Sequence, residues 1–232
     1  MPDSRIVCYV EREAQACEIL VKNIEAGRLD DAPIWSDADT FDSSPWCGLV
    51  DWIIGGPPCQ PFSGASYVRL GAGDSRNQWP TTLRITEEVT PQGLFFENVP
   101  SKASLTYIHD HVLPRLRELD YRVETGIFSA SEVGAPHQRK RIFILATDSK
   151  RKRAKGLVPR EDPSLLRPWR WSGKEDLRSI ASAPLERGDR WPQPIIRGVD
   201  DGMAYRMDRI HLIGNGVVPL QAALAFQTLY QR

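Results

Sequence analysis

The sequence predicts an open α/β sheet in one domain with a modest extension. Its 232 residues suit one domain on the usual size of about 100–200 residues. Residues 6–10 form a short apolar run typical of a buried strand, and 13–26 carry apolar side chains at helical spacing. A strand followed by a helix, repeated along the chain, is typical of an open α/β sheet.

The same alternation continues toward the C-terminus. Gly134 and Pro136 provide a turn signal between two of the later apolar runs. In chain order, we expect strands at 49–54 and 93–96, a helix at 109–119, strands at 121–129 and 141–146, and a closing helix at 217–230.

Charge is distributed unevenly, although 30 basic and 30 acidic residues give zero formal net charge. Residues 1–45 hold four Lys or Arg against ten Asp or Glu, whereas 148–190 hold twelve against seven. Prolines and tryptophans recur without a clear period from residue 148 onward, and we interpret 148–203 as an irregular inserted region. Its basic excess suits an anionic partner.

Composition also excludes several classes of protein. No stretch approaches the ~20 apolar residues that span a bilayer, and no signal-peptide pattern opens the chain. We therefore expect a cytoplasmic protein with no membrane partner. Four cysteines, Cys8, Cys17, Cys47 and Cys59, lack zinc-ligand spacing and form no disulfide framework, so we expect no metal.

Cys59 stands out because it lies in a Gly- and Pro-rich turn, Gly-Gly-Pro-Pro-Cys-Gln-Pro-Phe-Ser, directly after the apolar run 49–54. Ligands of open α/β sheets gather at such turns, and a cysteine there can be a nucleophile. The alternative is a small buried apolar side chain, which is the usual role of a free cysteine. A rigid turn favours the nucleophile.

Three further motifs follow this turn along the chain. They are Glu-Asn-Val at 97–99, Arg-Lys-Arg at 139–141 and Gly-Asn-Gly-Val-Val-Pro at 214–219. In this order and together with Pro-Cys-Gln, they resemble the motifs of the cytosine-5 DNA methyltransferase family, and the region after 148 looks most like its prophage-associated branch. The resemblance implies a Rossmann-like S-adenosylmethionine-dependent sheet with a small irregular target-recognition insertion.

In this family, Cys59 corresponds to the thiolate that adds to carbon 6 of cytosine, which makes carbon 5 nucleophilic. Glu97 corresponds to a protonated carboxyl that neutralises charge near nitrogen 3 and therefore needs a raised pKa. Arg139 and Arg141 alternate at a strand entry, so we expect both to face one side and to hold the carbonyl oxygen of the base and a phosphate. For Glu97 and the arginines, the alternative is a solvated surface.

The resemblance also implies a site for the methyl donor, S-adenosylmethionine. It places Glu11 at the ribose hydroxyls and Asp37 near the adenine amine, with Pro58 and Asn215 completing the pocket. For Asp37, a helix-cap or turn role remains open.

Two departures from the family pattern concern the donor and the base. The family's first strand and its Phe-x-Gly-x-Gly turn are absent before Glu11, and the loss of a central strand is expected to leave unpaired backbone groups on both sides. His137 occupies the position where the family usually has Gln.

We expect a catalytic domain at 1–147, a small basic target-recognition region at 148–203, and a return to the catalytic domain at 204–232.

These features favour a DNA (cytosine-5-)-methyltransferase that acts on a flipped base in double-stranded DNA as a monomer. One alternative is a tRNA cytosine-5 methyltransferase, which the short recognition region permits. Another is a truncated, inactive nucleic-acid-binding remnant.

Overall fold

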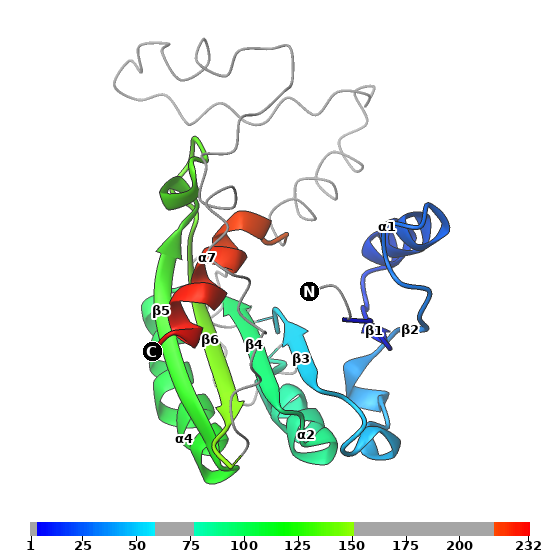
Figure 1. Ribbon diagram of the computed structural model, residues 1–232, viewed down its shortest axis with the longest axis horizontal. Helices are drawn as coiled ribbons and strands as arrows, with labels where there is room; N and C mark the ends of the chain where they lie inside the picture. The colour runs from blue at the N-terminus through cyan, green and yellow to red at the C-terminus, as the bar shows by residue number, and fades with distance from the viewer. Residues whose placement is uncertain (1–3, 59–76, 151–215) are drawn as a thin grey trace.

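The computed structural model describes residues 4–58, 77–150 and 216–232. Cys59, Asn215 and nearly all of the expected recognition region therefore lie outside the described residues. The described strands form two sheets (Figure 1). The smaller sheet pairs β1 (Tyr9–Val10) with β2 (Ile34–Trp35) in parallel. The expected strand at 6–10 is therefore shorter than its apolar run.

The larger sheet has the order β3-β4-β6-β5. Its strands are β3 (Trp52–Gly55), β4 (Gly93–Asn98), β5 (Tyr121–Ser129) and β6 (Lys140–Asp148). β3 and β4 are parallel, whereas β6 is antiparallel to both of its neighbours. The start of β6 consequently lies beside the end of β4.

Helices cover both faces of this sheet (Figure 1). The described α-helices are α1 (Ala14–Glu25), α2 (Trp79–Val89), α3 (Lys102–Tyr107), α4 (Leu113–Glu118) and α7 (Pro219–Tyr230). A π-helical turn, η4 (Ile108–Val112), joins α3 to α4. The helix expected at 109–119 thus begins earlier, and its wider turn precedes Pro114, which lacks an N–H for the helical ladder.

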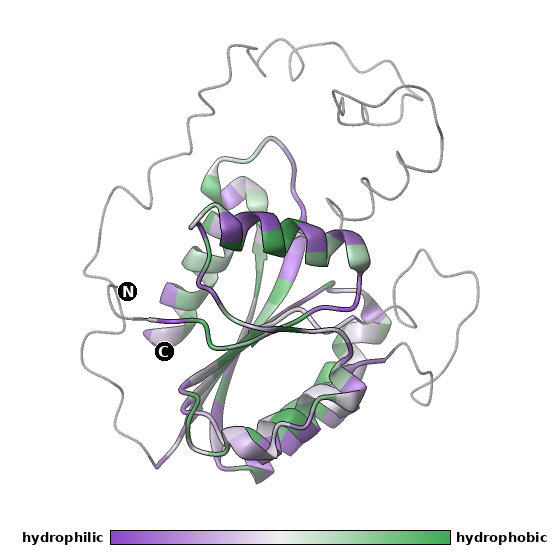
Figure 2. Ribbon diagram, turned by 90° about the vertical axis from the view of Figure 1, so that its right-hand side faces the viewer, coloured by the Kyte–Doolittle hydropathy of each residue, from purple (hydrophilic) through white to green (hydrophobic). Residues whose placement is uncertain are grey.

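The core is divided by the sheet because successive residues of a strand point to opposite faces. Leu94 and Phe96 of β4 pack on one face with residues of α2, η4 and α4. Phe95 points to the other face and packs with Phe143 and with Leu229 of α7. Along the helices, hydrophobic and hydrophilic stretches alternate (Figure 2), as expected where one side of a helix covers a sheet.

The small sheet is joined to the larger unit through α2. Arg84 of α2 donates to the carbonyl oxygens of Ala38, at 2.9 Å, and Phe41, at 3.2 Å. Ala38 belongs to the short helix η1 (Ala38–Thr40), which follows β2. Within the described residues, β3 pairs only with β4, so no described strand links the two sheets.

Candidate active site

An acid and an arginine meet where β4 ends and β6 begins. Arg141 Nε lies 2.6 Å from Glu97 Oε1, and the two side chains are only 14% and 18% exposed. The antiparallel register places Glu97 opposite Phe143 and Asn98 opposite Ile142, which brings Arg141 to the end of β4. A nearly buried carboxylate beside a guanidinium group can bind a polar planar ligand that supplies both donors and acceptors.

Burial raises the pKa of Glu97 above its ordinary value, because a carboxylate loses hydration inside the protein. The positive charges of Arg141 and Arg139 oppose this rise. The net direction is upward, so the protonated form of Glu97 persists to higher pH than that of an exposed glutamate.

Arg139 lies immediately before β6, not within it. Its backbone has φ of 26°, in the left-handed region, so the strand alternation expected for Arg139 and Arg141 does not apply. The guanidinium nevertheless lies close enough to Glu97 and Arg141 for their charges to shift its pKa. Burial, and then the charge of Arg141, lower the pKa of Arg139, whereas Glu97 raises it. Arg139 Nη2 also donates to the carbonyl oxygen of Gly216.

The turn that leads to Cys59 starts beside this cluster. Asn98 Nδ2 donates to the Pro57 carbonyl oxygen at 3.0 Å, and the Gln78 amide donates to that of Pro58 at 3.3 Å. A side-chain carbon added at Gly56 would lie 3.4 Å from Glu97 Oε2. The chain therefore passes against Glu97 three residues before Cys59, whose own position lies outside the described residues.

Glu11 and Asp37 follow the two strands of the small sheet. Because β1 and β2 are parallel, both residues lie at the same, carboxyl edge. Glu11 Oε1 accepts from the Glu13 amide at 2.8 Å, just before α1. Asp37 Oδ1 accepts from the Asp39 amide at 3.0 Å and caps η1, so the turn role left open for Asp37 is present.

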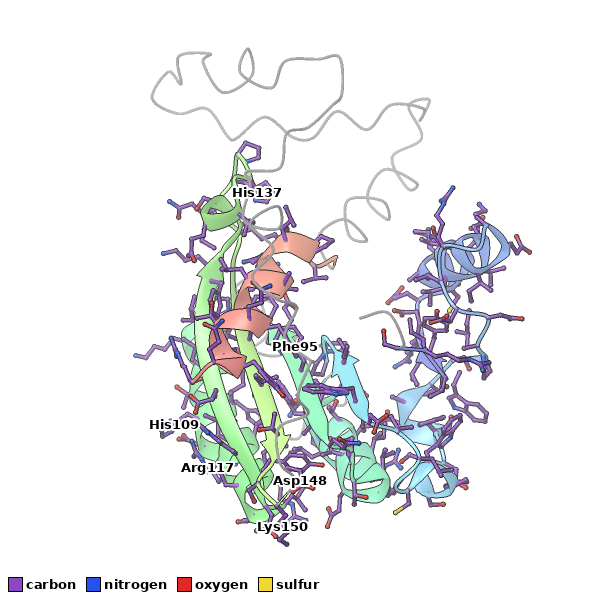
Figure 3. The ribbon with its side chains drawn as sticks, viewed as in Figure 1. Phe95, His109, Arg117, His137, Asp148 and Lys150 are labelled. Atoms are coloured by element: carbon purple, nitrogen blue, oxygen red, sulfur yellow. The ribbon has the colours of Figure 1, made fainter. Side chains whose placement is uncertain are left out.

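His137 is exposed at the tip of the connection between β5 and β6, at the opposite end of the sheet from Asp148 and Lys150 (Figure 3). In the described part of the chain, no group of three or more His, Cys, Asp or Glu side chains could hold a metal ion. None of the described helices is long and apolar enough to cross a membrane.

Two residues near the cluster were not assigned roles from the sequence. Asn98 belongs to the Glu-Asn-Val motif, and this motif was the available signal for it. Gln221 of α7 is fully buried and donates to the carbonyl oxygens of Phe128 and Arg139. Its position shortly after the Gly-Asn-Gly-Val-Val-Pro motif was the one signal for it in the sequence.

An α/β sheet flanked by helices, with Glu-Asn-Val at the end of β4 and Arg-Lys-Arg at the start of β6, is the arrangement expected of a methyltransferase-like protein. The family model for C-5 cytosine-specific DNA methylase matches residues 3–191, and the chain belongs to this family. This result confirms the resemblance found in the sequence.

Individual relatives agree with the family. The type II methyltransferase M.AplI of Arthrospira platensis is 35% identical over 102 residues, covering 43% of this chain and 29% of that protein. M.NaeI of Lentzea aerocolonigenes, also a type II methyltransferase, is 33% identical over 145 residues, covering 61% and 34%. The chain thus spans about a third of the length of these relatives.

A crystal structure of a DNMT2 mutant from Spodoptera frugiperda has a similar fold. The TM-score is 0.52 at 21% identity, covering 69% of this chain and 47% of that one. This likeness supports the predicted α/β methyltransferase fold.

Proposed function

We propose that this chain carries the catalytic residues of a DNA (cytosine-5-)-methyltransferase that uses S-adenosylmethionine. The observation that carries the proposal is the cluster of Glu97, Arg139 and Arg141 beside the turn that leads to Cys59. In that cluster, a carboxyl with a raised pKa contacts the guanidinium of Arg141 and lies within electrostatic range of that of Arg139. This combination suits a base that must accept a proton at one atom and be held at another.

Each residue has a distinct role in this proposal. The Cys59 thiolate adds to carbon 6 of a cytosine that has been turned out of the duplex. Charge displaced into the ring is neutralised by the proton of Glu97 at nitrogen 3, while Arg139 and Arg141 hold the carbonyl oxygen and a phosphate. Carbon 5 gains the methyl group, with S-adenosylhomocysteine as the leaving group, and then loses its proton to a base or to water. Elimination of the Cys59 thiolate and return of the nitrogen 3 proton to Glu97 make the ring aromatic again.

S-adenosylmethionine, when bound, supplies an electrophilic methyl group to carbon 5. Glu11 and Asp37 suit its nucleoside, since two carboxylates at the carboxyl edge of parallel strands can accept hydrogen bonds from ribose and amine groups. Pro58 and Asn215 are proposed to complete the pocket. The backbone N–H groups of Glu13 and Asp39 each bond one oxygen of Glu11 and Asp37, respectively, so these carboxylates are also held in a defined orientation.

The partner proposed for the basic region 148–203 is double-stranded DNA. Its Lys and Arg side chains would neutralise phosphates and release counterions, so affinity should fall steeply with salt. Equal binding at low and high salt would contradict this part of the proposal. The monomeric state and the prophage-associated placement stay predictions.

The deciding experiment measures transfer of labelled methyl from S-adenosylmethionine to mixed-sequence duplex DNA, with tRNA as a parallel substrate. Cys59→Ala is the matched variant, and mass spectrometry identifies the product base. We expect 5-methylcytosine in DNA with the intact cysteine only. Methylation of tRNA alone would replace the substrate, and DNA binding without any transfer would support the inactive remnant.

A further inference from the structure

Gln221 holds together two backbone positions that lie far from it in the sequence. Its Nε2 donates to the carbonyl oxygen of Phe128 at 2.8 Å and to that of Arg139 at 2.9 Å. Phe128 is near the end of β5, and Arg139 directly precedes β6. The side chain is completely buried, so water does not compete for these bonds.

Arg139 needs such support because its backbone conformation is unfavourable. A φ of 26° in a residue with a Cβ is strained and persists only where neighbouring contacts determine it. The preceding carbonyl, of Gln138, is already held by the Ala130 amide at 2.8 Å and by the Ser129 hydroxyl. Gln221 holds the next carbonyl, that of Arg139 itself, and therefore restrains the peptide from which the guanidinium extends.

The segment around α7 also contacts the other end of Arg139. The carbonyl oxygen of Gly216, five residues before Gln221, accepts from Arg139 Nη2. Backbone and guanidinium of Arg139 are thus both bound by the same stretch of chain. These two contacts determine where the positive charge lies relative to Glu97 and Arg141.

The amide group is specifically suited to this place. One nitrogen with two N–H groups can serve two carbonyl oxygens, whereas a carboxylate has no donor and would be repelled by both. Gln221 Oε1 is buried and has no hydrogen-bond partner among the described residues. An apolar side chain would avoid the cost of burying that oxygen, so the amide is explained by its two donor bonds.

We propose that Gln221 is a positioning residue for Arg139. It does not touch the reacting base; it holds the peptide of Arg139 so that the guanidinium keeps its place at the end of the sheet where Glu97 and Arg141 meet. The consequence for methyl transfer rests on the proposed function, whereas the positioning of Arg139 does not.

The positioning is tested directly by the rate at which phenylglyoxal modifies each arginine of the folded, full-length chain. The modified chain is then digested, and mass spectrometry of its peptides gives the rate for each arginine. The variant Gln221→Met keeps the size of the side chain and removes both donors. Gln227→Met, the same change on α7, is the control, because no side-chain hydrogen bond of Gln227 is found in the described part of the protein. Arg84, bound to Ala38 and Phe41, is the internal reference.

We expect Arg139 to react several-fold faster in Gln221→Met than in the wild type, with Arg84 unchanged and with both rates unchanged in Gln227→Met. An unchanged Arg139 rate would overturn the proposal, and so would an equal acceleration of Arg84, which indicates general loosening. Gln221→Asn, which shortens the reach by one methylene, is measured in the same way if Gln221→Met does not fold. Failure of both variants to fold would show a purely structural role and also overturn the proposal.

A double-mutant cycle with Arg139→Ala then connects the position to activity. Gln221→Met should lower kcat for methyl transfer by about 10- to 100-fold with a smaller effect on KM, as expected for misplacement of a catalytic group. In the Arg139→Ala background, the same change should have no further effect, and an equal loss in both backgrounds would refute positioning through Arg139. If the wild type transfers no methyl group, the proposed function fails while the modification rates still decide the role of Gln221.

Discussion

Arg141 Nε lies 2.6 Å from Glu97 Oε1, and this ion pair joins the start of β6 to the end of β4. Both side chains are largely shielded from water, so each charge is stabilised by the other more than in a surface pair. The pair brings together two motifs that are more than forty positions apart in the printed sequence.

Glu97→Gln should change how stability depends on pH. Between the ordinary pKa of 4.5 and the raised pKa of Glu97, the folded protein keeps a proton that the unfolded chain has released. The free energy of unfolding therefore falls as pH rises through this interval, by at most ~1.4 kcal/mol per pH unit, and this part of the fall should vanish in Glu97→Gln. Urea unfolding at a series of pH values above 4.5 measures it. Parallel curves for both proteins would contradict the raised pKa.

Arg141→Ala should destabilise the fold at neutral pH because it leaves the carboxylate of Glu97 without its nearest counter-charge. We expect a loss of about 1–3 kcal/mol, below the value for completely buried pairs, since both side chains keep some contact with water. Arg122→Ala is the control, because its pair with Glu124 is more exposed and should contribute only ~0–1 kcal/mol. Chemical denaturation compares the two, and equal losses would refute the special environment of Arg141.

Asn98→Leu should release the turn that leads to Cys59. It removes the bond to the Pro57 carbonyl and leaves that oxygen and the Val99 amide without their partner, at a cost of about 1–3 kcal/mol. Methyl transfer by Asn98→Leu should be lower than that of the wild type even under conditions in which both proteins are folded. Asn23→Leu removes a similar amide-to-carbonyl bond on α1 and serves as the control. Equal activity of the two variants would show that the turn does not depend on Asn98.

Gly93→Ala should destabilise the contact between β3 and β4. A Cβ at this position would overlap ring atoms of Trp52, so the indole, which packs against Phe226, must shift. We expect a loss of about 1–3 kcal/mol, typical of overpacking. Gly55→Ala on the paired strand is the control, because its Cβ would meet Phe96 at an ordinary 3.9 Å. Thermal unfolding of both variants gives the comparison, and similar melting temperatures would be inconsistent with a clash at Gly93.

The elements with a clear local pattern were predicted well from the sequence. The helix expected at 13–26 is α1 (Ala14–Glu25), and the strand expected at 121–129 is β5 with the same bounds. β2 and α2 were not predicted. A two-residue strand has no period to detect, and α2 begins with Trp79 and Pro80 and mixes polar and apolar residues, so only packing against η1 and the sheet reveals it.

For the site, the sequence by itself determined which residue types flank which strands: Glu97 lies at the end of one apolar run, and Arg139 and Arg141 lie at the start of another. Only the tertiary structure decided that these residues gather, because β6 runs antiparallel to β4 and its start therefore lies beside the end of β4. The tertiary structure also decided that Arg139 lies before the strand in a left-handed conformation and that Gln221, 82 positions away, holds its carbonyl group. Such bonds depend on how α7 packs across β5 and β6, and no local periodicity records a side chain's distant backbone partner.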